Sequence, residues 1–376
     1  IIGGLIGKMY DGILTYANSS ASVDGGFSIG GAIGEMSTGS VSYVDITGSV
    51  HSDRTEGEFI AKSGENTGGF VGYMYEGTIT SSTASGDVEC EGGKCGGFIG
   101  YAASGNALIT NSSASGDVTV VDGFSPSYIG GFAGYVENSG YNWEDPYVYG
   151  VEWVNLSAAG SVFATSSDSV GGFAGRVYGY DLSSVSSTGG VVIGDSYVGG
   201  FVGEIFNSSV SSSTASSTVT GMDNYIGGFA GYSGCQSRFT RSQAFGDVFG
   251  AAAVGGFSGA DGCEGYGSTF TEVYTTGDVV ASVVAAGGLI GEAYLTTVER
   301  SYALGNVTAT GDNVGGLIGQ MIGYDGYEHS SVTDSYARGN VESTSGVQVG
   351  GLVGYIGAYT DMVNVYATGV ASGTTA

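Results

Sequence analysis

Four cysteines are the side chains best suited to covalent chemistry in this chain. Cys235 and Cys263 lie 28 residues apart, and Cys90 and Cys95 flank a short turn that contains glycine. If the chain repeats every 28 residues, Cys235 and Cys263 fall on adjacent rungs with Cα atoms about 5 Å apart, inside the disulfide range. Cys90 and Cys95 then close a small disulfide loop. Two disulfides predict an oxidising, extracellular location, and the alternative is free, buried thiols.

Catalytic groupings are absent from the sequence pattern. The two histidines, His51 and His329, are remote in the repeat order, so neither cysteine pair gains a partner for a zinc site. No Ser/His/Asp or Cys/His grouping pairs a nucleophile with a base. Some β-helices cleave polysaccharides with paired carboxylates, but no cluster of three or four acids falls on neighbouring rungs of one face. We predict no catalytic residue, no metal and no cofactor.

Acidic residues recur in one column of the repeat. Asp87 and Asp117 share this column on neighbouring rungs, as do Asp247 and Asp278, and Asn306 continues it. Stacked carboxylates repel unless they are screened or bridged by a cation such as Ca²⁺. The Gly-Gly-x-Gly-x-Asp repeat of calcium-binding β-rolls is missing, so Asp residues that form turns are favoured over a calcium site.

Two further sets of residues are candidate contact or modification sites. The first set has the Asn-x-Ser/Thr sequence of glycan acceptors, which arises by chance in a chain rich in Ser and Thr. Its members are Asn18, Asn111, Asn155, Asn207 and Asn306. The second set is a candidate ligand loop, because exposed aromatic rings suit contacts with sugars or proteins. Its members are Tyr141, Trp143, Tyr147, Tyr149 and Trp153. The alternative for this loop is a satellite cluster that seals a bulged rung. A smaller Tyr-rich insertion at 324–329 is a second candidate contact patch.

An internal repeat must position all of these residues. The pattern Gly-Gly-apolar-x-Gly occurs twelve times, and five of the eleven spacings are 28 residues. The repeats begin at Gly3, Gly30, Gly68, Gly96, Gly130, Gly171, Gly199, Gly227, Gly255, Gly287, Gly315 and Gly350. A second phrase, Ala84-Ser85-Gly86-Asp87-Val88, recurs in the same phase. Units this short cannot each bury a core, but stacked units share one.

The repeat predicts an all-β fold, a parallel β-solenoid (β-helix) of about twelve 28-residue rungs with two or three strands each. A 28-residue unit is too short for a propeller blade. The third residue of each unit is Phe, Leu or Ala and predicts an inward ladder, and Tyr274, Tyr302, Tyr336 and Tyr366 predict a stacked column. We expect one domain, 1–376, with loop insertions near 51–66, 121–128, 135–153, 260–270 and 324–331.

Several of these phrases resemble the GLUG motif. Gly3-Gly4-Leu5-Ile6-Gly7 and Gly287-Gly288-Leu289-Ile290-Gly291 carry the resemblance, together with Ser301-Tyr302-Ala303-Leu304-Gly305-Asn306-Val307. In the middle units Phe replaces Leu. The resemblance implies a large secreted or surface protein of bacteria or archaea, such as an adhesin or a protease of immunoglobulin. The motif itself implies no catalytic residue.

The two ends of the sequence are in phase with the repeat. The step from Gly369 through Ala376 into Gly3 of a following copy is 10 residues, the same as from Gly277 to Gly287. Neither end has a polar capping unit, and an uncapped rung is an open β edge. We therefore expect copies to join head to tail into a filament. The predicted assembly interface is Ile1, Ile2, Gly3, Gly4, Leu5, Gly369, Val370, Thr374, Thr375 and Ala376.

Composition excludes several classes of protein and partner. The chain has 74 Gly and only 2 Pro among 376 residues, which excludes collagen because Gly does not recur at every third position. A net charge of −27 disfavours nucleic acid and anionic membrane surfaces. The sequence has no run of 18 apolar residues, which a helix needs to span a bilayer.

We interpret the chain as a non-enzymatic, extracellular or cell-surface structural protein that forms a homopolymer, with glycans possible on Asn. The stalk of a surface adhesin that displays a ligand is the alternative, and a polysaccharide-active β-helix enzyme is the third.

Overall fold

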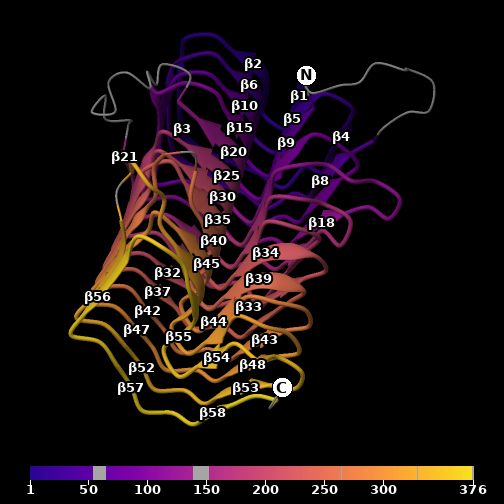
Figure 1. The fold of residues 1–376 in the computed structure, drawn as a ribbon. Coiled ribbons are helices and arrows are strands. Elements are labelled where there is room, and N and C mark those ends of the chain that lie inside the picture. The colour runs from indigo at the N-terminus through magenta and orange to yellow at the C-terminus, as the bar shows by residue number, and fades with distance from the viewer. Residues whose placement is uncertain (54–64, 139–151, 264, 328, 375–376) are drawn as a thin grey trace. The chain divides into compact units, whose positions relative to one another are not determined.

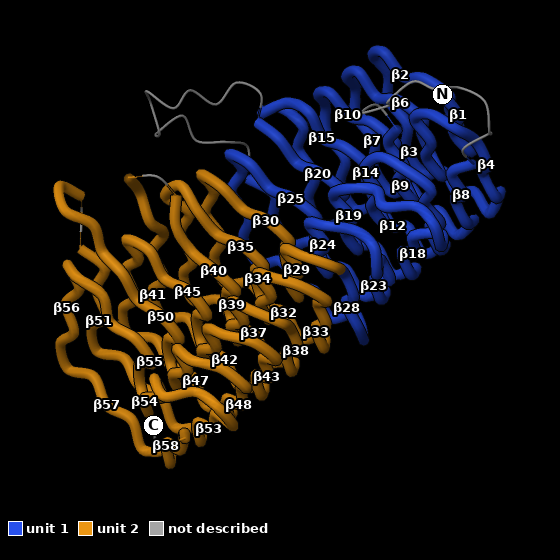
Figure 2. Tube along the Cα trace, turned by 45° about the vertical axis from the view of Figure 1, so that its right-hand side comes forward, with its two compact units in different colours: residues 1–194 blue, residues 195–376 orange. Residues whose placement is uncertain are grey.

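A computed structural model describes residues 1–53, 65–138, 152–263, 265–327 and 329–374. All of its secondary structure is β, and the described residues contain no helix (Figure 1). The chain forms two compact units, Ile1–Gly194 and Asp195–Ala376, each with six rungs of a parallel β-solenoid (Figure 2). The predicted fold class is therefore confirmed. The single domain with its insertions stays a prediction.

Each rung passes through four sheets, which we call A, B, C and D in chain order, and equivalent strands of successive rungs pair in parallel. The expectation of two or three strands per rung was too low. Most strands are only two to five residues long because left-handed corners interrupt them. Ser81, Asn111 and Asn155, with φ of 50°, 51° and 56°, divide sheet C in this way. A single sequence gives no clear signal for non-glycine residues in this conformation.

Sheet A carries the first glycine of each Gly-Gly pair. In unit 1 its strands are β1 (Ile2–Gly3), β5 (Ser28–Gly30), β9 (Asn66–Gly68), β14 (Lys94–Gly96), β19 (Ile129–Gly130) and β24 (Val170–Gly171). In unit 2 they are β29 (Val198–Gly199), β34 (Asn224–Gly227), β39 (Ala252–Gly255), β44 (Ala286–Gly287), β49 (Val314–Gly315) and β54 (Val349–Gly350).

Sheet B follows the Gly-Gly pair. In unit 1 its strands are β2 (Ile6–Met9), β6 (Ile33–Met36), β10 (Val71–Met74), β15 (Ile99–Ala102), β20 (Ala133–Glu137) and β25 (Ala174–Tyr178). In unit 2 they are β30 (Val202–Phe206), β35 (Ala230–Gly234), β40 (Ser258–Asp261), β45 (Ile290–Tyr294), β50 (Ile318–Ile322) and β55 (Val353–Ile356).

Sheet C bends at its left-handed corner, so most rungs contribute two strands to it. In unit 1 these are β3 (Ile13–Ser19), β7 (Ser40–Ile46), β11 (Gly77–Thr80), β12 (Thr83–Ala84), β16 (Ala107–Thr110), β17 (Ser113–Ala114), β21 (Glu152–Val154), β22 (Ser157–Ala158), β26 (Asp181–Ser183) and β27 (Ser186–Ser187). In unit 2 they are β31 (Ser209–Ser211), β32 (Thr214–Ala215), β36 (Arg238–Thr240), β37 (Gln243–Ala244), β41 (Thr269–Thr271), β42 (Tyr274–Thr275), β46 (Thr297–Glu299), β47 (Tyr302–Ala303), β51 (Ser330–Thr333), β52 (Tyr336–Ala337), β56 (Thr360–Val363) and β57 (Tyr366–Ala367).

Sheet D closes the rung. In unit 1 its strands are β4 (Val23–Gly25), β8 (Val50–Ser52), β13 (Val88–Cys90), β18 (Val118–Val120), β23 (Val162–Phe163) and β28 (Val191–Gly194). In unit 2 they are β33 (Thr218–Gly221), β38 (Val248–Gly250), β43 (Val279–Ala281), β48 (Val307–Ala309), β53 (Val341–Ser343) and β58 (Ala371–Ser372).

The core of each unit contains an axial ladder of stacked phenylalanine rings among aliphatic side chains. In unit 1 Phe70, Phe98 and Phe132 are fully buried, and successive rings stack with centroids 4.6 and 4.7 Å apart. This spacing equals the distance between parallel strands, so each ring packs on the next without a void. The Gly-Gly pair makes room for this packing. A Cβ on Gly68 would lie 2.0 Å from the carbonyl oxygen of Val71, and a Cβ on Gly69 would lie 2.1 Å from that of Gly97.

Candidate functional site

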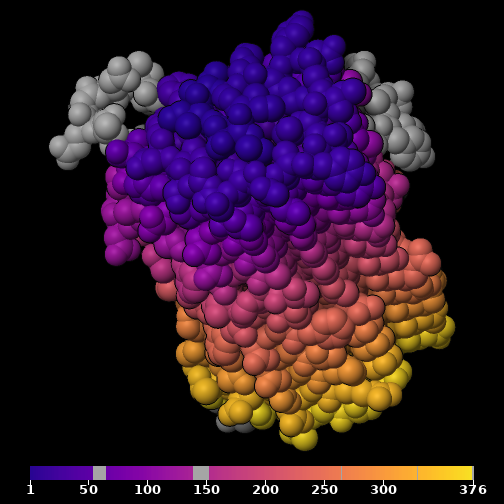
Figure 3. Space-filling view, turned by 180° about the vertical axis from the view of Figure 1, so that it is seen from behind, coloured from indigo at the N-terminus to yellow at the C-terminus, as the bar shows by residue number. Residues whose placement is uncertain are grey.

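The first rung presents core side chains to solvent. Its strands β1 to β4 pair with β5 to β8, and on their other side no strand of the described chain pairs with them. Ile2 is 41% exposed, whereas Ile29, its register partner in the next rung, is fully buried. Leu5, in the ladder position, is 38% exposed. The N-terminal segment that contains this rung is coloured indigo in Figure 3.

The last described rung shows the same property in unit 2. Its strands β54 to β58 pair only with the rung that precedes them in the described chain. Ile356 is 43% exposed, whereas its register partner Met321 is buried. Met362 is likewise exposed, and its partner Val332 is buried. Both edges therefore display side chains of the type that the interior buries.

The predicted assembly residues divide between these two rungs. The structure places Ile1, Ile2, Gly3, Gly4 and Leu5 in the first rung of unit 1 and Gly369, Val370 and Thr374 in the last rung of unit 2. Thr375 and Ala376 lie outside the described residues. Sequence reasoning missed the exposed Ile356 and Met362, although their phase in the repeat matches that of buried residues.

The acidic column is a hydrogen-bonded ladder. Each side-chain oxygen accepts a bond from the backbone N–H of the same position in the next rung. The distances are 2.9 Å from Asp117 N–H to Asp87 Oδ1 and 2.7 Å from Asn306 N–H to Asp278 Oδ1. This arrangement fits the turn-forming role. The residues that the structure describes include no group of three or more His, Cys, Asp or Glu placed to hold a metal ion.

Both cysteine pairs form disulfides. Cys235–Cys263 joins successive rungs of unit 2 with Cα atoms 5.2 Å apart, and Cys90–Cys95 closes a loop in unit 1 with Cα atoms 6.4 Å apart. Cys235–Cys263 cross-links the ends of the paired strands β35 and β40, whereas Cys90–Cys95 joins consecutive strands of one rung, β13 and β14, which do not pair with each other.

The five Asn-x-Ser/Thr asparagines lie on the outside of the rungs. Asn18, Asn111, Asn155 and Asn306 are exposed, and Asn207 is half-buried. Two of them use the amide nitrogen that would carry a glycan. Asn155 Nδ2 donates to Asn111 Oδ1 at 3.0 Å, and Asn306 Nδ2 donates to Asp278 Oδ1 at 3.1 Å. Glycosylation at these two positions would replace one of the two hydrogens on a nitrogen that donates a bond between rungs.

The candidate ligand loop requires one correction. Trp153 is fully buried, and its indole Nε1 donates to the carbonyl oxygen of Ala107, so it is a core residue and not an exposed ligand contact. This position matches the sealing-cluster alternative. The other four members, Tyr141, Trp143, Tyr147 and Tyr149, lie outside the described residues.

The comparisons with known proteins identify the repeat. The family model of the GLUG motif matches residues 63–89 and 194–220. Each match has the length of one rung and begins just before a Gly-Gly pair. No curated protein and no solved structure matches the chain. The described residues contain no helix that is long and apolar enough to cross a membrane. The repeat and the disulfides are consistent with an extracellular protein.

Proposed function

The chain is a GLUG-motif repeat protein, and from this premise we propose that it is a non-enzymatic, extracellular structural protein whose copies join head to tail into a filament. The repeat and the fold fit a structural or adhesin-like role. Assembly into a filament is the more specific part of the proposal. It requires that the strands of the last rung of one copy pair with those of the first rung of the next.

One observation carries the proposal. Core side chains are exposed on both edge rungs, although their register partners one rung away are buried. Exposed strand edges with apolar side chains are the usual sites of strand addition. A further rung on either edge would bury these side chains and pair the open strands.

A second copy of the chain offers the strand order that the edge requires. The first rung offers strands of sheets A, B, C and D in the same order as the last rung. Stacking β1 on β54 and β2 on β55 therefore continues two sheets in their existing parallel register. Because the contact uses two different surfaces, it does not close on itself and gives a filament.

Electron microscopy of the native secreted protein, without denaturant, tests the proposal. We expect filaments from the wild type and single copies from Ile356→Asp, which places a charge on the edge. The matched control is Phe249→Asp. Phe249 has similar exposure, 39%, but β38 pairs on both sides within unit 2. Circular dichroism shows whether both variants remain folded.

Two results would overturn assembly. One is that wild type remains single at every concentration, and the other is that Ile356→Asp still forms filaments. The intact mass of the native protein distinguishes a filament subunit from the stalk of a longer adhesin. A mass well above 37.6 kDa plus glycans would mean that further rungs of a longer chain cover the edges.

A further inference from the structure

A hollow interrupts the outward face of sheet B in unit 2. The third residue of strands β35, β40, β45 and β50 forms one column in register, Tyr232, Ala260, Glu292 and Gln320. Ala260 has only a methyl group in this column. Its neighbours Tyr232 and Glu292 are two strand spacings apart, about 9.6 Å, so the space between them is unfilled. A cavity of about 500 Å³ opens at this point.

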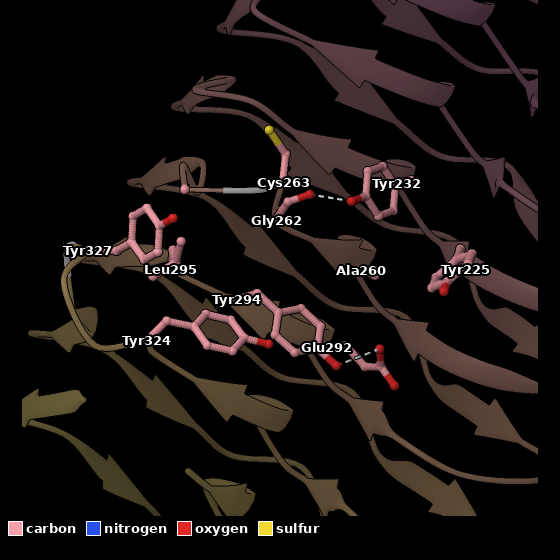
Figure 4. A pocket seen from close by; sticks show the side chains of 11 residues that line it. Tyr225, Tyr232, Ala260, Gly262, Cys263, Glu292, Tyr294, Leu295, Tyr324 and Tyr327 are labelled. Atoms are coloured by element: carbon pink, nitrogen blue, oxygen red, sulfur yellow. Dashed lines mark hydrogen bonds between the residues drawn. The ribbon is translucent and has the colours of Figure 1, made fainter. Parts of the chain in front are cut away.

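Tyrosine rings and one carboxylate line the cavity. The rings of Tyr225, Tyr232, Tyr294 and Tyr324 line it together with the carboxylate of Glu292 (Figure 4). Tyr294 donates its hydroxyl to Glu292 Oε2 at 3.2 Å, and Tyr232 donates to the carbonyl oxygen of Gly262. These bonds fix the orientation of both rings. The cavity is preformed and offers aromatic surface beside a negative charge.

The Glu292 carboxylate has no positive partner in the described part of the chain. It accepts a hydrogen bond from the Tyr294 hydroxyl, and it takes part in none of the ion pairs of the described residues. Burial raises the pKa of Glu292, and the bond from Tyr294 opposes this shift. A half-buried carboxylate without a counter-ion costs free energy, which a bound cation would offset.

Unit 1 has a similar group of tyrosine rings and a carboxylate, and there cationic side chains of the chain itself lie against the rings. There Tyr101 and Tyr135 occupy the same column, and Tyr101 donates to Glu137 Oε2 at 2.6 Å. Lys94 Nζ lies 4.4 Å from the ring centroid of Tyr101, and Arg176 Cζ lies 5.6 Å from that of Tyr135. Cations therefore sit against the rings beside the carboxylate. In unit 2 the rings and the carboxylate are present, but the described residues supply no cation to them.

We propose that the cavity between Tyr232 and Glu292 binds an organic cation, an ammonium or guanidinium group held against the tyrosine rings with Glu292 as its counter-ion. A group of this kind gains cation–π attraction from tyrosine faces and Coulomb attraction from the carboxylate. The source is either a free small amine or the basic side chain of a partner protein. The site is independent of the filament edges, because its residues belong to internal rungs of unit 2.

Calorimetric titration of the full chain tests the site. The probes are choline, its neutral isostere 3,3-dimethylbutan-1-ol, and Nα-acetyl-lysine methylamide as a protein side chain. We expect both cations to bind and the isostere to bind about tenfold more weakly or not at all. Tighter binding of choline indicates a free small amine as the ligand, and tighter binding of the lysine derivative indicates a basic side chain of a partner protein.

Three variants locate the binding. Glu292→Gln removes the charge and keeps the shape, so we expect about a tenfold loss of choline affinity or more. Ala260→Tyr fills the hollow with a side chain that the column accepts at Tyr232, and we expect it to abolish binding. Glu204→Gln is the matched control, because Glu204 lies in the same column but does not line the cavity.

Three results would overturn the proposal. The first is that the neutral isostere binds as tightly as choline. The second is Glu292→Gln that binds choline like the wild type while thermal unfolding shows it folded. The third is that neither cation binds at millimolar concentration.

Discussion

The indole Nε1 of Trp153 donates a 2.7 Å hydrogen bond to the backbone carbonyl oxygen of Ala107 inside unit 1. The indole also contacts the rings of Phe132 and Tyr180 edge-on, with centroids 6.1 and 5.5 Å away. Trp153 is the last residue of the predicted insertion 135–153, and the buried indole anchors strand β21 of sheet C.

Trp153→Phe should destabilise the protein. The substitution leaves the buried carbonyl of Ala107 without its short donor, a loss of about 1–3 kcal/mol. Urea unfolding followed by circular dichroism measures the change. An unfolding midpoint equal to that of wild type would contradict the buried bond.

Fluorescence gives an independent check of Trp153. In a Trp143→Phe background the remaining indole is Trp153, because the chain has two tryptophans. We expect blue-shifted emission that iodide does not quench, since the side chain is fully buried. Emission at the wavelength of exposed indole would show that Trp153 is accessible, as a ligand contact would be.

The disulfide between rungs should contribute more stability than the local one. Cys235–Cys263 closes a loop of 28 residues, and Cys90–Cys95 spans 5. In the chain-entropy model these loops are worth about 3.5 and about 2 kcal/mol. Paired substitution to serine removes each bond without leaving a free thiol. Urea unfolding of the two double variants compares them, and a larger loss for Cys90/Cys95 would contradict the expected order.

The repeat predicted the rungs, the Phe ladder and the partners of Cys235 and Cys263, because each of these follows from residues that recur at a fixed period. It did not predict the number of strands. Corner residues such as Ser81 and Asn111 take a left-handed backbone although they differ in type from rung to rung. Stacking between rungs imposes that conformation, so the residues next to the corner in the sequence do not predict it.

The cavity was invisible to sequence reasoning for a related reason. Tyr324 belongs to the Tyr-rich insertion that the sequence singled out as a contact patch, and it does line the cavity. Ala260 and Glu292 carry no motif. They form the cavity because the strand register places them in one column with Tyr232. A small residue such as Ala260 leaves a hollow only where its neighbours in the column are larger.

The Asp and Asn column should tolerate loss of charge but not loss of its oxygen. Asp278 Oδ1 accepts bonds from the backbone and side-chain nitrogens of Asn306 at 2.7 and 3.1 Å. Asp278→Asn keeps an acceptor and should leave stability nearly unchanged, whereas Asp278→Ala should cost about 1 kcal/mol. Urea unfolding distinguishes them. Equal losses for both variants would indicate that the charge itself matters, as a bridging cation requires.

Asp261 should make stability depend on pH. Burial raises the pKa of this carboxyl above its usual 3.8, although bonds from Ser268, Thr296 and Ser233 lower it. The folded state therefore holds the proton more tightly than the unfolded chain. Its stabilising contribution is complete below pH 3.8 and is lost as pH rises through the raised pKa.

Comparison with variants that cannot titrate isolates this contribution from the general effect of a net charge of −27. Tyr232 interacts with Asp261, but burial raises the pKa of Tyr232 to about 12, so it does not titrate at acidic or neutral pH. We expect the free energy of unfolding of wild type to fall relative to Asp261→Asn and Asp261→Ala as pH rises from 3.8 towards neutrality. The two variants differ in their hydrogen bonds but share the loss of titration, so their curves should be parallel to each other. Wild-type stability that runs parallel to both across this range would show that Asp261 has the same pKa in the folded and unfolded states.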